Sequence, residues 1–138
     1  MDEKYLGYVA ALIDGEGSCF IQQKQGKYLN GMLNVEMSDK RTIQFIQTLF
    51  EGKVSSIVRK DTPRTMYRWS ATNYSKTLKQ ILPYMITKEP QAILLLTFQN
   101  LQTGEKVTPE SLILKKVIKK IMTNINRKGM VKFAPDYD

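Results

Sequence analysis

The stretch VAALIDGEGSCF, residues 9–20, joins an apolar, helix-forming run to a strand-like segment through two acids that are one glycine apart. The acids are Asp14 and Glu16, and Gly17 follows them at once. Two carboxylates at i and i+2 project from different sides of a helix, so we expect them to have different tasks. A carboxylate at the negative end of a helix is unfavourable on its own, and a bound divalent cation makes it favourable. Oxygen ligands at this point predict a magnesium site.

The composition restricts the chemistry that this chain can perform. Its 138 residues include one cysteine and no histidine, which excludes an internal disulfide, cysteine-rich zinc motifs and histidine-dependent catalysis. The formal net charge of +8 is in the range of a domain that binds nucleic acid, but charge alone does not choose between DNA, RNA and anionic lipid as the partner. No apolar run is long enough to span a bilayer, so we expect an intracellular protein. The composition does not choose between the cytoplasm of a prokaryote or phage host and an organelle, and both stay open.

The periodicity along the chain predicts the element order α-β-β-α-β-β-α. Strands are expected over residues 18–25, 29–37, 53–61 and 65–72, with turns near Gly26-Lys27 and Thr62-Pro63. A second helix begins after Ser38 or Asp39 as its cap, and a third runs from an Asn73 cap to Leu82, before Pro83. This order predicts an α+β fold with a four-stranded antiparallel sheet, helices on one face and the other face open.

Two further helices are expected in the last third of the chain. One covers residues 89–101 with Thr87 as candidate cap, and the other begins at Thr108-Pro109. The apolar positions of the last helix are Ile113, Val117, Ile121 and Ile125, and its lysines are expected to be a solvated face. We expect one domain over residues 1–138, with residues 127–138 as a loose tail.

Polar residues alternate along the predicted strands, which places them on one face of the sheet. The plainest interpretation is a solvated sheet face, and the functional one is a surface that reads base edges in a DNA major groove. The candidate DNA-binding residues are Gln22, Lys24, Asn30, Asn34, Glu36, Ser55, Arg59, Arg64, Arg68 and Ser70. The adjacent Trp69 and the single Cys19 are expected in the core.

The run VAALIDGEG, residues 9–17, resembles the LAGLIDADG motif of homing endonucleases. It matches that motif at Ala10, Leu12, Ile13, Asp14 and Gly17. Residues 34–54 and 81–96 resemble the second helix of the family and its Pro-aromatic-x-x-x-Lys-x-x-Gln-Ala passage. The resemblance therefore covers residues 5–101, and it implies the LAGLIDADG fold.

The resemblance also implies roles for individual residues. Glu16 takes the place of the essential metal-binding acid, and the Gly15 carbonyl takes that of an assisting backbone oxygen. Asp14 is the acid that is mainly structural in the family, and Lys88 matches the basic residue near the scissile phosphate. The family's outer polar position falls within Met37, Ser38 and Asp39, of which Asp39 is taken as the catalytic candidate.

The chain contains one copy of the motif, so one chain supplies one Glu16. The resemblance to single-motif members of the family implies a homodimer in which the two motif helices pair. Small residues on the motif helix would let the two helices approach closely. The predicted dimer interface is Gly7, Ala10, Ala11 and Asp14.

The activity that the resemblance implies is a staggered double-strand break, with short 3′ overhangs, in a long, near-palindromic DNA target. The cofactor is Mg²⁺, and Mn²⁺ or Ca²⁺ is expected to substitute for binding. Two alternatives stay open: an RNA maturase that assists splicing of its own intron, and a non-cleaving DNA-binding regulator of the same fold.

Overall fold

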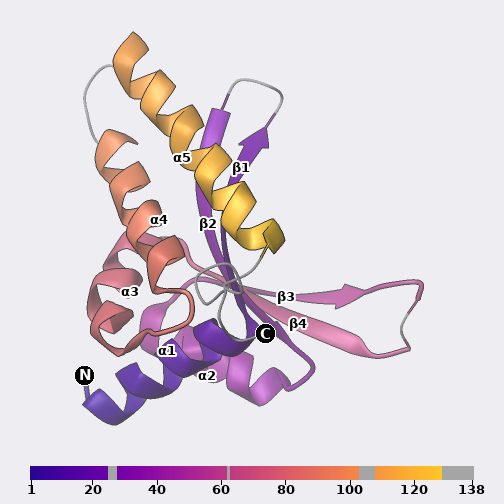
Figure 1. Ribbon diagram of the computed structural model, residues 1–138. Helices are drawn as coiled ribbons and strands as arrows, with labels where there is room; N and C mark the ends of the chain where they lie inside the picture. The colour runs from indigo at the N-terminus through magenta and orange to yellow at the C-terminus, as the bar shows by residue number, and fades with distance from the viewer. Residues whose placement is uncertain (25–27, 62, 103–107, 129–138) are drawn as a thin grey trace, which may run out of the picture.

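The computed structural model describes residues 1–24, 28–61, 63–102 and 108–128 of the chain. The motif helix is followed by two strand pairs that alternate with helices, and then by two C-terminal helices (Figure 1). In chain order the elements are α1 (Glu3–Glu16), β1 (Gly17–Lys24), β2 (Tyr28–Met37), α2 (Lys40–Phe50), β3 (Lys53–Val58), β4 (Thr65–Ser70), α3 (Tyr74–Ile81), the 3₁₀ turn η1 (Leu82–Tyr84), α4 (Glu89–Gln102) and α5 (Pro109–Lys128). The predicted α+β order is confirmed.

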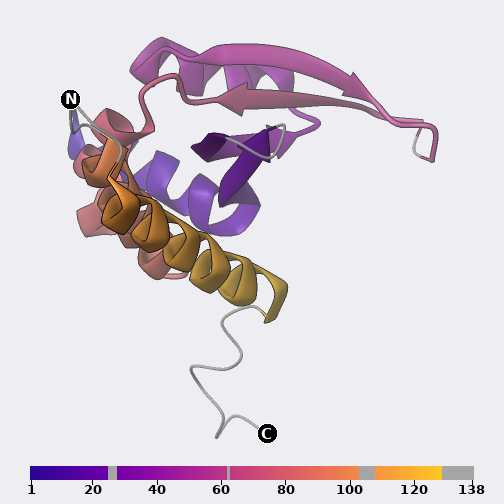
Figure 2. The ribbon, with the colours of Figure 1, turned by 90° about the horizontal axis from the view of Figure 1, so that it is seen from above.

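The four strands form one antiparallel sheet in the order β1-β2-β4-β3. The β3–β4 hairpin extends beyond the helices, while the helices gather on one side of the sheet (Figures 1 and 2). The turn predicted at Gly26-Lys27 and the Thr62 half of the second turn lie outside the described residues. The third and fourth strands end at Val58 and Ser70, earlier than predicted.

The core lies between the helices and one face of the sheet. Paired residues of antiparallel strands share a face, so Leu33, opposite Cys19, and Val35, opposite Trp69, point to the same side. All four are buried, which confirms the core positions predicted for Cys19 and Trp69. The helices contribute further buried side chains, among them Val9, Ile13, Ile43, Ile46, Leu78, Ile81, Leu95, Phe98, Ile118 and Met122.

Side-chain caps begin several helices, as the sequence predicts. Between the two candidates for α2, the structure selects Asp39, whose carboxylate accepts a hydrogen bond from the Arg41 N–H at 3.0 Å. Asn73 caps α3 by accepting from the Lys76 N–H at 3.1 Å. Thr108 and Ser111 exchange hydrogen bonds at the start of α5, each accepting from the backbone N–H of the other at 3.1 Å.

The C-terminal helix differs from its prediction in three respects, one of which is that Lys115, a lysine expected on its solvated face, is only 7% exposed. Its core-facing side chains are Ile118 and Met122, while Ile113, Val117 and Ile121 are exposed, so the predicted apolar face was wrong. The apolar residues of α5 are spread over more than one stripe, and the packing of α5 on α4 and β1 decides which stripe is buried. The helix also runs to Lys128, so residues 127 and 128 do not belong to a loose tail.

Among the described residues, the helices are all too short or too polar to cross a membrane.

Candidate active site and nucleic-acid interface

Glu16 is the last residue of α1 and its side chain is exposed. The chain turns into β1 at Gly17, whose N–H donates to the Ile13 carbonyl and closes the helix. A Cβ at Gly17 would lie 2.7 Å from both the Cα and the carbonyl oxygen of Ile13, so only glycine fits this turn. The sharp turn leaves the Glu16 carboxylate and the Gly15 segment at the surface.

Asp14 fastens this helix end to the segment before α4. Its two carboxylate oxygens accept hydrogen bonds from the backbone N–H groups of Ile86, at 2.8 Å, and of Lys88, at 2.9 Å. The Lys88 ammonium donates in turn to the Asp14 carbonyl at 2.7 Å. Because the last turn of α1 carries no basic residue, Lys88 supplies the positive charge that the negative end of a helix favours. The structure thus brings the predicted residues Asp14 and Lys88 to one point, beside Glu16.

A pocket of about 280 Å³ adjoins this point. Lys88 and Asn126 line it together with the first residues of β1, Gly17 to Phe20. The Asn126 amide nitrogen donates a hydrogen bond to the Cys19 carbonyl at 2.8 Å. The Asn126 amide oxygen accepts one from the Gln91 amide nitrogen at 3.5 Å. A carbonyl can only accept, so this contact fixes the orientation of both amides and leaves the buried Gln91 Oε1 without a partner in the described residues.

Sequence reasoning missed Gln91 and Asn126. Gln91 lies inside the passage that supports the family resemblance, and that was the available signal. Asn126 has no such signal, because its position beside β1 depends on how α5 packs.

Cys19 lies beneath the same site and is only 1% exposed. Burial raises the pKa of its thiol to about 12, and this net value already includes a smaller, opposite effect of the nearby Lys88 charge. The thiol is therefore neutral at physiological pH, which agrees with a packing residue.

Asp39, the third catalytic candidate, is engaged in capping α2. Besides the Arg41 N–H, its carboxylate accepts a hydrogen bond from the Thr42 hydroxyl at 3.1 Å. The Thr42 bond lowers the pKa of the Asp39 carboxyl below its usual value. These contacts give Asp39 a structural task, and its catalytic role stays a prediction.

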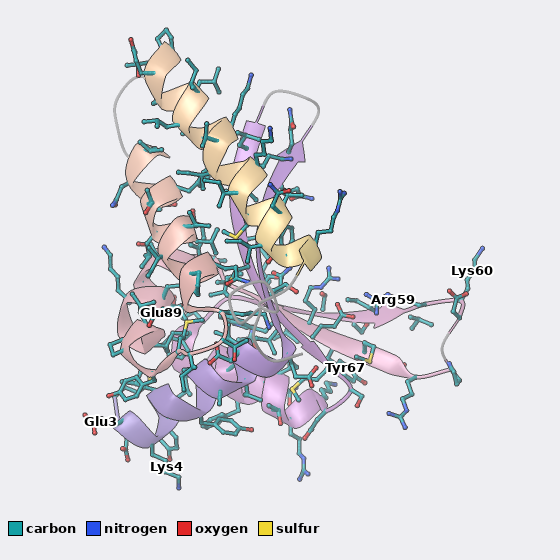
Figure 3. The ribbon with its side chains drawn as sticks, viewed as in Figure 1. Glu3, Lys4, Arg59, Lys60, Tyr67 and Glu89 are labelled. Atoms are coloured by element: carbon teal, nitrogen blue, oxygen red, sulfur yellow. The ribbon has the colours of Figure 1, made fainter. Side chains whose placement is uncertain are left out.

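The candidate DNA-binding residues gather on the sheet face opposite the core. The strand register places Gln22 opposite Asn30, Asn34 opposite Ser70, and Arg68 opposite both Glu36 and Ser55. All seven therefore share one face, as predicted. Figure 3 shows Arg59 at the outer end of the β3–β4 hairpin, Arg64 lies exposed before β4, and the side chain of Lys24 lies outside the described part of the chain.

Two details of this face differ from the prediction. Asn34 is only 8% exposed, so its side chain is buried, whereas the prediction placed it at the surface. Glu36 is paired with two arginines: Arg59 Nη1 lies 2.6 Å from Oε1, and Arg68 Nη2 lies 2.9 Å from Oε2. The hydrogen bond from Arg59 and that from Arg68 lower the pKa of the Glu36 carboxyl, so it is ionised.

The predicted pairing surface on α1 is partly wrong. Ala10 is fully buried against the chain's own core and cannot contact a second copy. Ala11 and Gly15 are exposed on another side of the helix, and Gly7 is half-buried. A Cβ at Gly7 or Gly15 would have no described atom within 4 Å apart from its chain neighbours and the adjacent backbone of α1 itself, so packing against other elements does not explain either glycine.

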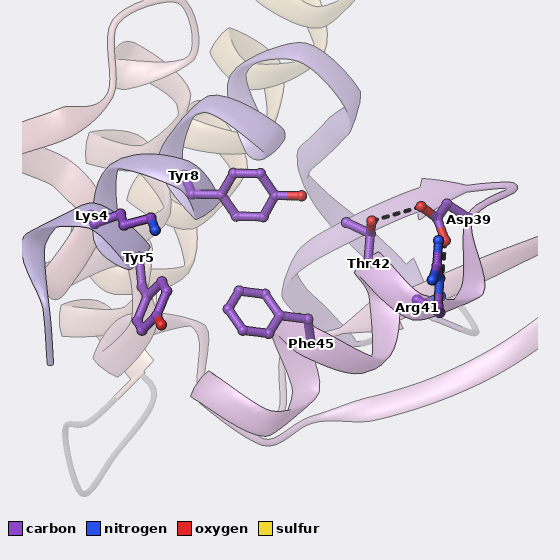
Figure 4. Close-up of a pocket in the computed structure, with 7 residues that line it drawn as sticks. All are labelled: Lys4, Tyr5, Tyr8, Asp39, Arg41, Thr42 and Phe45. Atoms are coloured by element: carbon purple, nitrogen blue, oxygen red, sulfur yellow. Dashed lines mark hydrogen bonds between the residues drawn. The ribbon is translucent and has the colours of Figure 1, made fainter.

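Beside these residues lies a hollow of about 650 Å³ between α1 and α2 (Figure 4). The rings of Tyr5 and Tyr8 meet the Phe45 ring edge-on, with centroid distances of 5.4 and 6.0 Å. Tyr5 and Tyr8 are 37% and 44% exposed, so an aromatic surface borders the motif helix.

Comparison with known proteins gave matches among solved structures alone, because no protein-family model and no curated protein matches the sequence. The homing endonuclease I-CvuI in complex with its target is 21% identical with a TM-score of 0.73, over 89% of this chain and 82% of that chain. The archaeal intron-encoded homing endonuclease I-Vdi141I complexed with DNA is 18% identical with a TM-score of 0.73, over 89% of this chain and 85% of that one.

The LAGLIDADG homing endonuclease I-LtrWI bound to target DNA is 19% identical with a TM-score of 0.62, over 88% of this chain and 45% of that one. These similarities show that the chain has the fold of LAGLIDADG homing endonucleases. The fold that the motif implied is confirmed.

Proposed function

We propose that this chain is a site-specific DNA endonuclease of the LAGLIDADG homing type, which cuts a long, near-palindromic duplex as a homodimer. The observation that carries the proposal is the arrangement at the end of α1. Asp14 is held by two backbone N–H groups, Lys88 is fixed beside the helix end, and Glu16 remains exposed. A packing role would bury or pair Glu16, whereas this arrangement prepares it to bind a ligand at a rigid point.

The donors at this point fit a hard divalent cation such as Mg²⁺. Glu16 offers a carboxylate and Gly15 a backbone carbonyl, both oxygen ligands. Within the described residues, no three acidic, cysteine or histidine side chains gather to hold a metal. One chain therefore supplies an incomplete set of ligands, which a second copy of the α1 end would complete. When bound, the metal would orient water and neutralise charge on the scissile phosphates.

The chain's own residues would position the phosphate. Lys88, whose ammonium is held at the Asp14 carbonyl, would place its positive charge near a phosphate that approaches a cation held by Glu16. The Asp14 contacts keep Lys88 and Glu16 at a fixed separation, because both the helix end and the segment before α4 are tied to one carboxylate.

Two surfaces support the proposed dimer and its target. Ala11 and Gly15 would let a second α1 approach closely, which would bring the two Glu16 residues together. The polar sheet face carries Arg59 and Arg68, and the chain's +8 charge favours binding to phosphates. A symmetric dimer would read a near-palindromic site.

The test is cleavage of a randomised duplex DNA library with Mg²⁺ by the wild type and by Glu16→Gln. We expect double-strand cuts at one family of sites, and a loss of at least 100-fold in rate for Glu16→Gln, on the order of other single catalytic groups. Binding of the selected duplex in Ca²⁺ should survive the substitution.

Glu3→Gln is the matched control, since it makes the same change at an exposed position in the first turn of the same helix. It should cut like the wild type. Selective binding without cleavage would replace the endonuclease with a DNA-binding regulator, and preference for folded intron RNA over any duplex would support a maturase.

A further inference from the structure

One carboxylate on the polar sheet face holds two guanidinium groups. Glu36 on β2 accepts from Arg59 Nη1 at 2.6 Å through Oε1, and from Arg68 Nε at 3.2 Å and Nη2 at 2.9 Å through Oε2. The Glu36 side chain is 23% exposed, and those of Arg68 and Arg59 are 37% and 49% exposed. The cluster therefore lies at the surface with part of each arginine accessible.

The contacts on Arg68 use one particular edge of its guanidinium. Nε and Nη2 form the side edge, and both donate to the same oxygen of Glu36. A guanidinium has five N–H groups in a planar fork, so the end edge, formed by Nη1 and the outer hydrogen of Nη2, still offers two parallel donors. Two parallel donors match the N7 and O6 acceptors of guanine in the major groove.

The strands make this geometry rigid. Glu36 and Arg68 are directly opposite in the β2–β4 register, so the backbone fixes their separation. Arg59, just beyond β3, holds the other carboxylate oxygen and prevents the Glu36 side chain from turning away. A pre-oriented arginine loses less conformational freedom on binding than a mobile one.

We propose that Glu36 is a specificity-determining residue that orients Arg68 to read one guanine in each half of the DNA target. The inference rests on the proposed function, since it requires that this sheet face binds duplex DNA. Glu36 also offsets one of two adjacent positive charges. Without it, Arg59 and Arg68 would be available to phosphates, which carry no sequence information.

The experiment is selection of binding sites from a randomised duplex library in Ca²⁺, so that the readout does not need cleavage. We expect the wild type to prefer guanine at one position of each half-site, and Glu36→Gln to lose about tenfold of that discrimination. Binding of an unrelated duplex should strengthen about threefold and fall more steeply with salt, because the variant loses a negative charge beside Arg59 and Arg68.

Two controls separate orientation from charge. Glu36→Asp keeps the charge but shortens the reach, so it should also lose the guanine preference, without stronger binding to the unrelated duplex. Glu110→Gln makes the same charge change in the first turn of α5 and should leave the preference intact. Thermal unfolding of each variant checks that it folds. If Glu36→Gln does not fold, the guanine preference of Glu36→Asp decides the test.

The outcomes distinguish the two proposals. If the wild type enriches no duplex, both the proposed function and this inference are overturned. If the wild type enriches a site and both Glu36 variants select the same bases with the same discrimination, the Glu36 inference alone is overturned.

Discussion

Asp14 shows how one carboxylate determines the geometry of the candidate site. An asparagine side chain has a single acceptor oxygen, so in Asp14→Asn one of the two N–H groups of Ile86 and Lys88 would face an amide donor. We expect the free energy of unfolding to fall by about 1–3 kcal/mol, because a hydrogen bond to a charged group is lost at an at most partly buried site. Urea denaturation of the two proteins measures the difference.

Asp2→Asn is the control for that substitution. Asp2 caps the other end of α1 by accepting from the Lys4 N–H at 3.0 Å, and asparagine caps as well as aspartate does. It should leave stability within about 0.5 kcal/mol of the wild type. If Asp14→Asn were equally harmless, the proposed fastening of the helix end would be wrong.

The buried thiol of Cys19 should make the protein less stable at alkaline pH. Its pKa is raised by burial from 9.0 to about 12, so above pH 9 the unfolded chain loses this proton while the folded chain keeps it. The folded state then binds more protons than the unfolded state, and the free energy of unfolding falls by about 1.4 kcal/mol per pH unit up to the folded pKa. Below pH 9 the contribution is constant.

Comparison with Cys19→Ala isolates this effect, because the other titrating groups, Tyr74 among them, are common to both proteins. From about pH 8 to about pH 10 the wild type should lose roughly 1.4 kcal/mol more than the variant in urea denaturation. Parallel stability curves would show that the thiol is not buried in solution as it is in the structure.

Among the elements, α5 gives a direct test of which helix face is buried. Ile118 is 7% exposed and Ile121 is 42% exposed, although both are isoleucines less than one turn apart on one helix. Ile118→Ala should lower the free energy of unfolding by about 2–4 kcal/mol, since it leaves a cavity. Ile121→Ala should change it by less than about 1 kcal/mol. A larger loss for Ile121→Ala than for Ile118→Ala would support the face that periodicity predicted.

For the whole molecule, the decisive question is whether two copies pair through α1. Gly15→Leu tests this, because a Cβ at that position has no described atom within 4 Å beyond its chain neighbours and the adjacent backbone of α1. The single chain should fold as well as before, or slightly better, since leucine favours a helix by up to about 1 kcal/mol over glycine. Close approach of two α1 helices should be blocked, so we expect at least tenfold weaker dimerisation in analytical ultracentrifugation.

Thr97→Leu is the matched control, an exposed position on α4 that is not on the proposed pairing surface. It should leave the association unchanged. A Gly15→Leu protein that dimerises as strongly as the wild type would move the interface away from α1, and the aromatic hollow at Phe45 would be the next surface to examine.

Much of the candidate site was predictable because it depends on local sequence. Asp14 and Glu16 stand at a helix end because Gly17 stops the helix, and period-two alternation puts Gln22, Glu36 and Arg68 on one sheet face whatever the rest of the chain does. The order of the seven core elements follows from the same short-range periodicities and caps. Lys88 was assigned through a sequence passage, without knowledge of its contacts.

Contacts between distant segments were decided by the tertiary structure alone. The Asp14 carboxylate could meet the Lys88 segment only after η1 and α1 had packed together, and Asn126 could meet Cys19 only after α5 had packed on β1. The same holds for the buried stripe of α5, for Ala10 in the core and for the ion pairs of Glu36 with Arg59 and Arg68. Local sequence determines which residues share a helix or strand face, but burial of apolar surface across the whole chain selects which face turns inward.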